Sequence, residues 1–95
     1  METKATYGKW GMIRRTYLKE HCKVEYNRLV IKMELIAHLN EIDEQARNLW
    51  ETIMEQLERQ PPTPTPPQGT MEWVQHQNRL RAIADEQVLN DIIYN

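Results

Sequence analysis

The stretch ELIAHLNEIDEQARNLWETIMEQLER, residues 34–59, decides the fold of this chain. Apolar side chains recur along it at steps of four and three, the spacing of one face of an α-helix: Leu35, Leu39, Ile42, Ala46, Leu49, Ile53 and Leu57. Ile36, Trp50 and Met54 widen this face beyond what a two-stranded coiled coil uses, which favours a helical bundle. On the side expected to be exposed, ion pairing four residues apart is predicted among Asp43, Arg47 and Glu51.

The composition of the rest of the chain predicts an all-α protein. The 95 residues include three glycines and five prolines, the prolines all lie within residues 61–67, and no run has the period-two pattern of a strand. We expect a single domain over residues 1–95: a small bundle of three to four helices with one long central helix and a proline-rich connector, residues 61–69, before the last helix.

The same sequence carries no sign of export or of a membrane. Its one cysteine, Cys22, cannot form an internal disulfide. There is no charged and then apolar leader, and no apolar run approaches the roughly 18 residues that a membrane span needs. We therefore expect a cytoplasmic protein without membrane contact.

Shorter elements are predicted on both sides of the central helix. Residues 1–9 lack periodicity and are expected to be a disordered tail, residues 12–21 are expected to form a short helix, and another begins near Lys23. A bend at residues 32–34 is expected, because an unbroken helix would point its apolar side chains in nearly every direction. Thr70 should cap a last helix over residues 71–94, antiparallel to the central one, with an apolar stripe that ends at Ile92. The predicted core and interface residues are Leu35, Leu39, Ile42, Leu49, Trp50, Ile53, Trp73, Leu80, Ala84 and Val88.

The residue types argue against catalysis. Serine is absent, and His21, His38 and His76 lie far apart without the spacing of metal ligands. A cysteine nucleophile needs a base and an orienting group in a cleft, and a bundle of this size offers little cleft. Glycine-rich loops that cradle phosphates are also missing. We therefore expect that the protein is not an enzyme and has no metal or cofactor.

Charge is divided sharply along the chain. The total is −2, but residues 1–32 carry a net charge of +5 and residues 33–60 a net charge of −5. If helical, the basic third forms a ridge suited to a phosphate backbone, and its candidate DNA-binding residues are Arg14, Arg15, Lys19, Lys23, Arg28, Lys32 and Tyr17. The alternative is a protein-interaction module in which the basic segment pairs with the acidic helix of a second subunit. Both interpretations stay open on the residues alone. We expect a homodimer, because the central helix has a broader apolar face than the last helix can cover.

Five segments occur in an order typical of one known family. They are Trp10-Gly11, Arg14-Arg15-x-Tyr17-Leu18-Lys19-Glu20-His21, Ile42-Asp43-Glu44-Gln45-Ala46, Met71-Glu72-Trp73-Val74 with Asn78-x-x-Arg81, and Asp91-Ile92-Ile93-Tyr94. In these segments the chain resembles the TnpV family of small proteins encoded on transposons. The resemblance implies a non-catalytic accessory factor of a mobile element, such as an excisionase-like protein, with DNA or a DNA-bound site-specific recombinase as its partner.

Two departures from the family pattern are informative. Family members usually carry Ser-Gly where this chain has Lys32-Met33, which by analogy supports a helix break at this point. The proline connector stands where members have a longer, charged link, so the function that the family shares is not expected to lie there.

Overall fold

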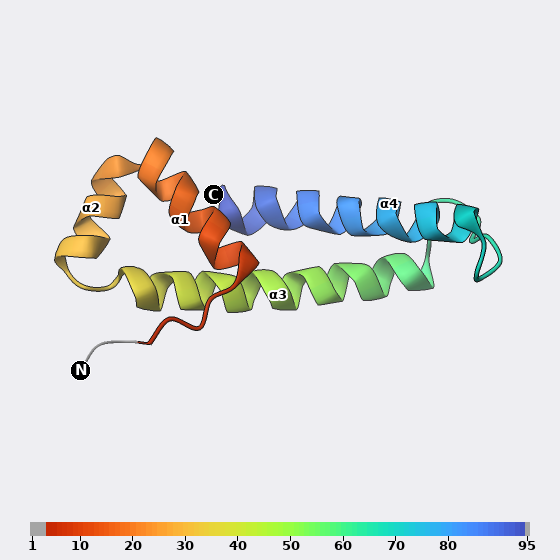
Figure 1. The fold of residues 1–95 in the computed structure, drawn as a ribbon, viewed down its shortest axis with the longest axis horizontal. Coiled ribbons are helices and arrows are strands. Elements are labelled where there is room, and N and C mark those ends of the chain that lie inside the picture. Colours follow the sequence, from red (N-terminus) through yellow and green to blue (C-terminus); the bar gives the residue numbers. More distant parts are fainter. Residues whose placement is uncertain (1–3, 95) are drawn as a thin grey trace.

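The computed structural model describes residues 4–94, which form four α-helices and one π-helix (Figure 1). The elements are α1 (Lys9–His21), α2 (Lys23–Ile31), α3 (Leu35–Arg59), α4 (Met71–Val88) and η1 (Leu89–Ile93), the π-helix that continues α4. α3 is the longest helix; α4 lies antiparallel to it, and α1 and α2 fold back beside its first half (Figure 1). The predicted all-α fold around one long central helix is confirmed.

The predicted bend between the second helix and the central helix is present, and its backbone geometry explains it. Met33, between the end of α2 and the start of α3, has a φ of 59°, in the left-handed region that is unfavourable for a residue with a side chain. The Met33 N–H donates to the Val30 carbonyl at 3.0 Å, and the Glu34 N–H donates to the Leu29 carbonyl at 2.9 Å. These two bonds define a Schellman motif, whose left-handed position is most often glycine. The chain therefore makes this turn with a residue that is strained there.

The start of the chain differs in detail from the sequence prediction. α1 begins at Lys9, earlier than the expected start at residue 12. Residues 4–8 belong to the expected tail. They are not helical, and several of them are hydrogen-bonded to α3, while residues 1–3 lie outside the described residues.

Residues 60–70 contain all five prolines and link α3 to α4 without a helix. Thr70 caps α4 as predicted, because its Oγ1 accepts the Trp73 N–H at 3.1 Å.

Buried apolar side chains form two clusters along α3. One cluster joins α1, α3 and the end of the chain through Trp10, Ala46, Val88 and Ile93. The other joins only α3 and α4, through Met54, Leu80 and Ala84. Of the predicted core residues, four are buried (Leu39, Leu80, Ala84 and Val88) and six are half-buried (Leu35, Ile42, Leu49, Trp50, Ile53 and Trp73).

The π-helix changes which residue ends the apolar stripe of the last helix. Leu80, Ala84 and Val88 follow one another at steps of four, and the next fully buried residue is Ile93, five positions on. This longer step follows from the i→i+5 hydrogen bonding of a π-helix. Ile92, which a continuous α-helix would have placed on the stripe, is only half-buried.

Candidate functional site

Three of the predicted DNA-binding residues lie together at the junction of α1 and α2. Arg15, Lys19 and Lys23 line one shallow hollow of about 450 Å³, with Thr16 and Glu20 between them. Four-residue spacing along α1 places Arg15 and Lys19 on the same face, and Lys23 opens α2 directly afterwards. Among residues 4–94, none of these three cations has a carboxylate within ion-pair distance. We call this group the basic hollow.

Arg14 points elsewhere and holds three parts of the chain together. Its Nη1 donates to the Ile93 carbonyl at 2.7 Å, and its Nε lies 3.4 Å from His38 Nε2. Its guanidinium also stands 5.6 Å from the centre of the Tyr17 ring. A cation at a free carbonyl of a helix end satisfies the acceptor and complements the helix dipole. Arg14 thus links α1 to α3 and η1, and is not part of the basic hollow.

The remaining predicted cations lie on α2 and in the turn that follows it. Arg28 pairs with Glu25 on the same exposed face at 2.6 Å, a type of pair that adds little stability. Lys32 is exposed at the C-cap of α2, next to the strained Met33. The structure therefore does not gather Arg28 and Lys32 into the basic hollow.

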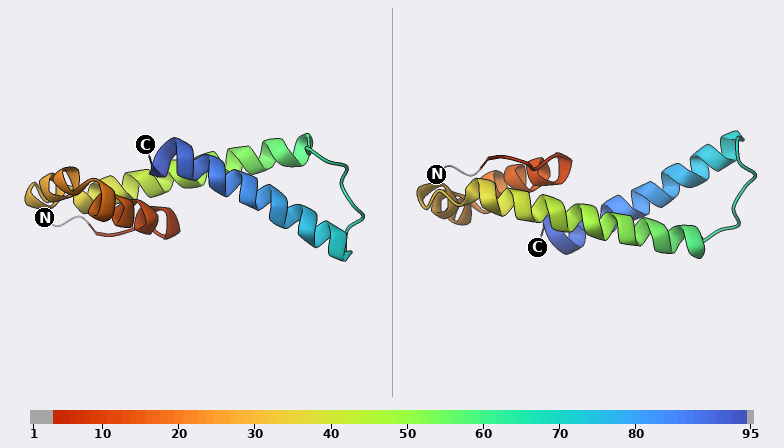
Figure 2. Two further views of the ribbon diagram at one scale, coloured as in Figure 1. Left: turned by 90° about the horizontal axis from the view of Figure 1, so that it is seen from above. Right: turned by 90° about the horizontal axis from the view of Figure 1, so that it is seen from below.

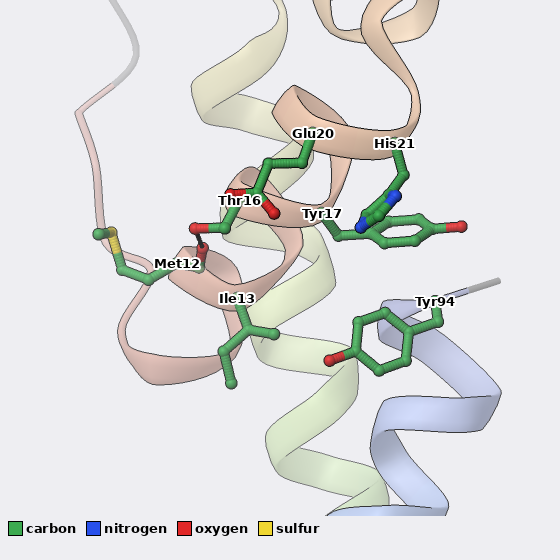
Figure 3. A pocket seen from close by; sticks show the side chains of 7 residues that line it. All are labelled: Met12, Ile13, Thr16, Tyr17, Glu20, His21 and Tyr94. Atoms are coloured by element: carbon green, nitrogen blue, oxygen red, sulfur yellow. Dashed lines mark hydrogen bonds between the residues drawn. The ribbon is translucent and has the colours of Figure 1, made fainter.

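Tyr17 belongs to a second hollow on the neighbouring face of α1 (Figure 3). Its ring centre lies 5.1 Å from that of Tyr94 and 5.5 Å from that of His21. The pKa of the Tyr17 hydroxyl is raised, first by the neighbouring Cys22 side chain and then by burial, while the positive charge of Arg14 acts in the opposite direction. The two hollows share Thr16 and Glu20, so aromatic and cationic side chains border each other here.

His38, in the first turn of α3, contacts Arg14. Its pKa is lowered, first by burial and then by the positive charge of Arg14, while Glu41 and Glu25 act in the opposite direction. In its neutral form the imidazole accepts the Arg14 Nε–H, so the two side chains fit together best when His38 is uncharged.

The sequence analysis missed a pair of polar residues on α3 that hold the start of the chain. Asn40 Oδ1 accepts the N–H groups of Thr6 at 2.8 Å and Tyr7 at 3.0 Å, and its Nδ2 donates to the Lys4 carbonyl at 2.9 Å. One turn further along α3, Asp43 Oδ1 accepts the N–H groups of Gly8 and Gly11, both at 3.0 Å. We call Asn40 and Asp43 the polar clasp.

The prediction that Asp43 lies on the exposed side of the central helix was wrong. The residue is only 2 % exposed, because its carboxylate lies at the N-terminus of α1, where free N–H groups and the helix dipole favour a negative charge. The expected pair with Arg47 is present at 3.1 Å, through the second carboxylate oxygen. Gly11 allows Tyr7 to lie against the first turn of α1, since a Cβ on Gly11 would come within 2.4 Å of the Tyr7 Cβ.

A second acidic residue acts across helices in the same region. Asp85 on α4 accepts the Trp50 indole N–H at 2.8 Å, and its other oxygen lies 3.7 Å from Lys9 Nζ.

Segments that carry the family resemblance contact each other in the structure. Gly11 donates to Asp43, and Arg14 donates to the carbonyl of Ile93.

Two further properties of the described part of the chain bear on its chemistry. Residues 4–94 contain no group of three or more His, Cys, Asp or Glu side chains placed to hold a metal ion. None of the helices described there is long and apolar enough to cross a membrane.

Together, the long central helix, the polar clasp and the basic hollow define a small all-α protein. The family model of the transposon-encoded protein TnpV matches residues 1–93. The chain therefore belongs to the TnpV family, as its resemblance predicted, and is a transposon-associated protein. Comparison with curated proteins and with solved structures found no match.

Proposed function

We propose that this protein is a non-catalytic accessory factor of its transposon, working in the cytoplasm, that contacts duplex DNA through the basic hollow in the manner of an excisionase. The observation that carries the proposal is the convergence of Arg15, Lys19 and Lys23 without carboxylate partners among residues 4–94. Unpaired cations on a helix face release counterions when they meet phosphates, which gives binding its dependence on salt.

The helix geometry suits contact with the DNA backbone. Arg15 and Lys19 lie one turn apart on α1, and Lys23 extends the series onto α2. Three phosphate contacts would give a slope of log affinity against log salt of about −2.7. Contacts of this kind position a protein on DNA, whereas sequence preference needs base contacts or DNA shape.

The test is fluorescence anisotropy with labelled duplexes from the ends of the host transposon, beside an unrelated duplex, over a salt series. The variant Arg15→Gln, Lys19→Gln, Lys23→Gln should bind more weakly and lose most of the salt slope. A control with the same change in net charge is Lys4→Gln, Arg79→Gln, Arg81→Gln, which removes exposed cations outside the hollow. If the hollow variant keeps the wild-type slope, or if both variants weaken binding equally, the proposal is wrong.

A second candidate is a helical interaction module that makes no contact with nucleic acid. It is favoured by exposed apolar side chains at α2 and the turn after it: Val24 is 85 % exposed, Ile31 80 % and Met33 76 %. A protein partner such as the recombinase of the same transposon would cover them. Val24→Gln, Ile31→Gln should then abolish binding to the purified recombinase and leave DNA anisotropy unchanged. Unaltered recombinase binding by this variant would contradict the second candidate.

A further inference from the structure

The described fold is elongated and exposes more surface than its mass requires. Its principal extents are 52 × 27 × 20 Å, and its radius of gyration is 16.6 Å, against about 12 Å for a compact domain of 95 residues. A folded monomer of 11.4 kDa typically exposes about 5,800 Å², whereas this chain exposes 6981 Å². The excess of about 1,200 Å² is larger than the roughly 800 Å² that each partner contributes to a standard stable interface.

The half of the α3–α4 pair nearest the proline-rich connector is packed against no other helix of residues 4–94. There α3 packs against α4 alone, because α1 and α2 lie beside the other half of α3 (Figure 1). Figure 2 shows that α3 and α4 cross at an angle and diverge toward the connector. Four apolar side chains of this region remain only half-buried: Leu49, Ile53, Leu57 and Ile83. A two-helix layer of this kind needs a further layer to complete its core.

One side of this helix pair forms a groove without any charged residue. The groove measures about 490 Å³ and is lined by Leu49, Ile53, Gln56, Leu57, Gln60, Ile83 and Gln87. Charged residues make up 27 % of the chain, so a lining of four apolar residues and three glutamines departs from the general composition. Depletion of charge is the compositional mark of the core of a protein interface. We call this surface the glutamine groove.

Its lack of charge determines which partner fits. A two-fold interface places each residue near its own copy, so a charged surface that meets itself is opposed by like-charge repulsion. Other exposed apolar surfaces include or adjoin charged residues that would face their own copies. The surface on α2 is bordered by Lys23, Arg28 and Lys32, and the hollow beside Trp73 contains Glu58. The side chains that line the glutamine groove carry no charge and do not repel their own copies; Asp91 borders the groove, where its carboxylate accepts the Gln87 Nε2–H at 2.8 Å.

We propose that two copies of this protein pack glutamine groove against glutamine groove around a two-fold axis, so that the two α3–α4 pairs stack as the two layers of a four-helix bundle. Two-layer helix packing of this kind buries the half-exposed Leu49, Ile53 and Ile83. The glutamines at the rim lie close to their counterparts and can hydrogen-bond across the interface. The dimer leaves the basic hollow of each copy uncovered, since the α1–α2 junction that carries it lies beside the first half of α3, away from the connector (Figure 1).

The test is sedimentation equilibrium of the full chain over a wide micromolar range of concentration. The wild-type protein should dimerise, and Gln56→Glu, Gln60→Glu should weaken dimerisation at least about tenfold in Kd, because four carboxylates then share one interface. A matched control is Gln75→Glu, Asn78→Asp, which adds two acids at exposed positions of α4 outside the groove. Circular dichroism checks that all variants keep their helix content.

A charge-swap experiment separates dimerisation from any effect on folding. Gln56→Lys, Gln60→Lys should also weaken self-association, while an equimolar mixture of the Glu and Lys variants should recover a heterodimer at least as stable as the wild type. Recovery can occur only if the two grooves face each other. A wild-type protein that stays monomeric throughout, a control that dissociates as readily as the groove variant, or a mixture without recovery would each overturn the proposal.

Discussion

Replacement of Asp43 tests whether this side chain on α3 stabilises the N-terminus of α1. Asp43 Oδ1 accepts two N–H groups, from Gly8 and Gly11, and these are the same two groups that a capping box satisfies within one helix. Asp43→Ala removes both charge-assisted bonds and leaves the buried Gly11 N–H without an acceptor. At about 1.5 kcal/mol for each bond to a charged group, the expected loss of unfolding free energy is about 3 kcal/mol.

Such a loss is large for a chain of this length. It corresponds to a decrease in Tm of roughly 12–24 °C, measured by circular dichroism during heating and by urea unfolding. Asp43→Asn should cost about half as much, because the amide oxygen still accepts both N–H groups while the charge is lost. Arg47→Ala should cost under about 1 kcal/mol, since its side of the ion pair is exposed. A loss below about 1 kcal/mol for Asp43→Ala, or equal losses for the Ala and Asn variants, would refute the assigned role.

Three further predictions concern single positions. Met33→Gly should stabilise the protein by about 1 kcal/mol in urea unfolding, since it relieves the left-handed φ of 59°; a loss of stability would contradict the strain. Gly11→Ala should destabilise by about 1–3 kcal/mol, because the new Cβ would clash with Tyr7, and a neutral effect would show that this segment can shift. His38 has a lowered pKa in the folded state, so its contribution to stability is complete above the unfolded pKa of about 6.5 and is lost as pH falls through the folded value. Arg14→Gln should raise the pKa of His38 in an NMR titration and reduce this loss, whereas an unchanged pKa would refute the coupling.

The central helix, its end at the prolines and the cap of the last helix follow from local physics and were predictable. Periodicity along residues 34–59 requires a helix with one apolar face, and the prolines that follow cannot continue it. Thr70 has a side-chain oxygen that reaches the free N–H of Trp73, three residues away. The bend at residues 32–34 was predictable because the apolar positions before and after it do not share a helix face. Its left-handed position is occupied by Met33 and not by the glycine that would have marked it in the sequence.

The candidate site was predictable only in part. Four-residue spacing placed Arg15 and Lys19 on one face, but adjacency in sequence could not show that Arg14 points away from them. The direction of the Arg14 side chain depends on its bond to the Ile93 carbonyl, and these two residues are 79 positions apart in the chain. The burial of Asp43 depends in the same way on α1 lying across α3, since an acid next to a cation one turn later is typical of an exposed helix face.

The sequence by itself determined which segments are helical, where the central helix ends and how charge divides between the segments, because these properties depend on neighbours within a few residues. Only the tertiary structure decided which polar side chains are structural and which are available to a partner. The buried carboxylate of Asp43 and the half-buried guanidinium of Arg14 are stabilised by unsatisfied backbone groups, and those groups are supplied by helix ends that are distant in the chain.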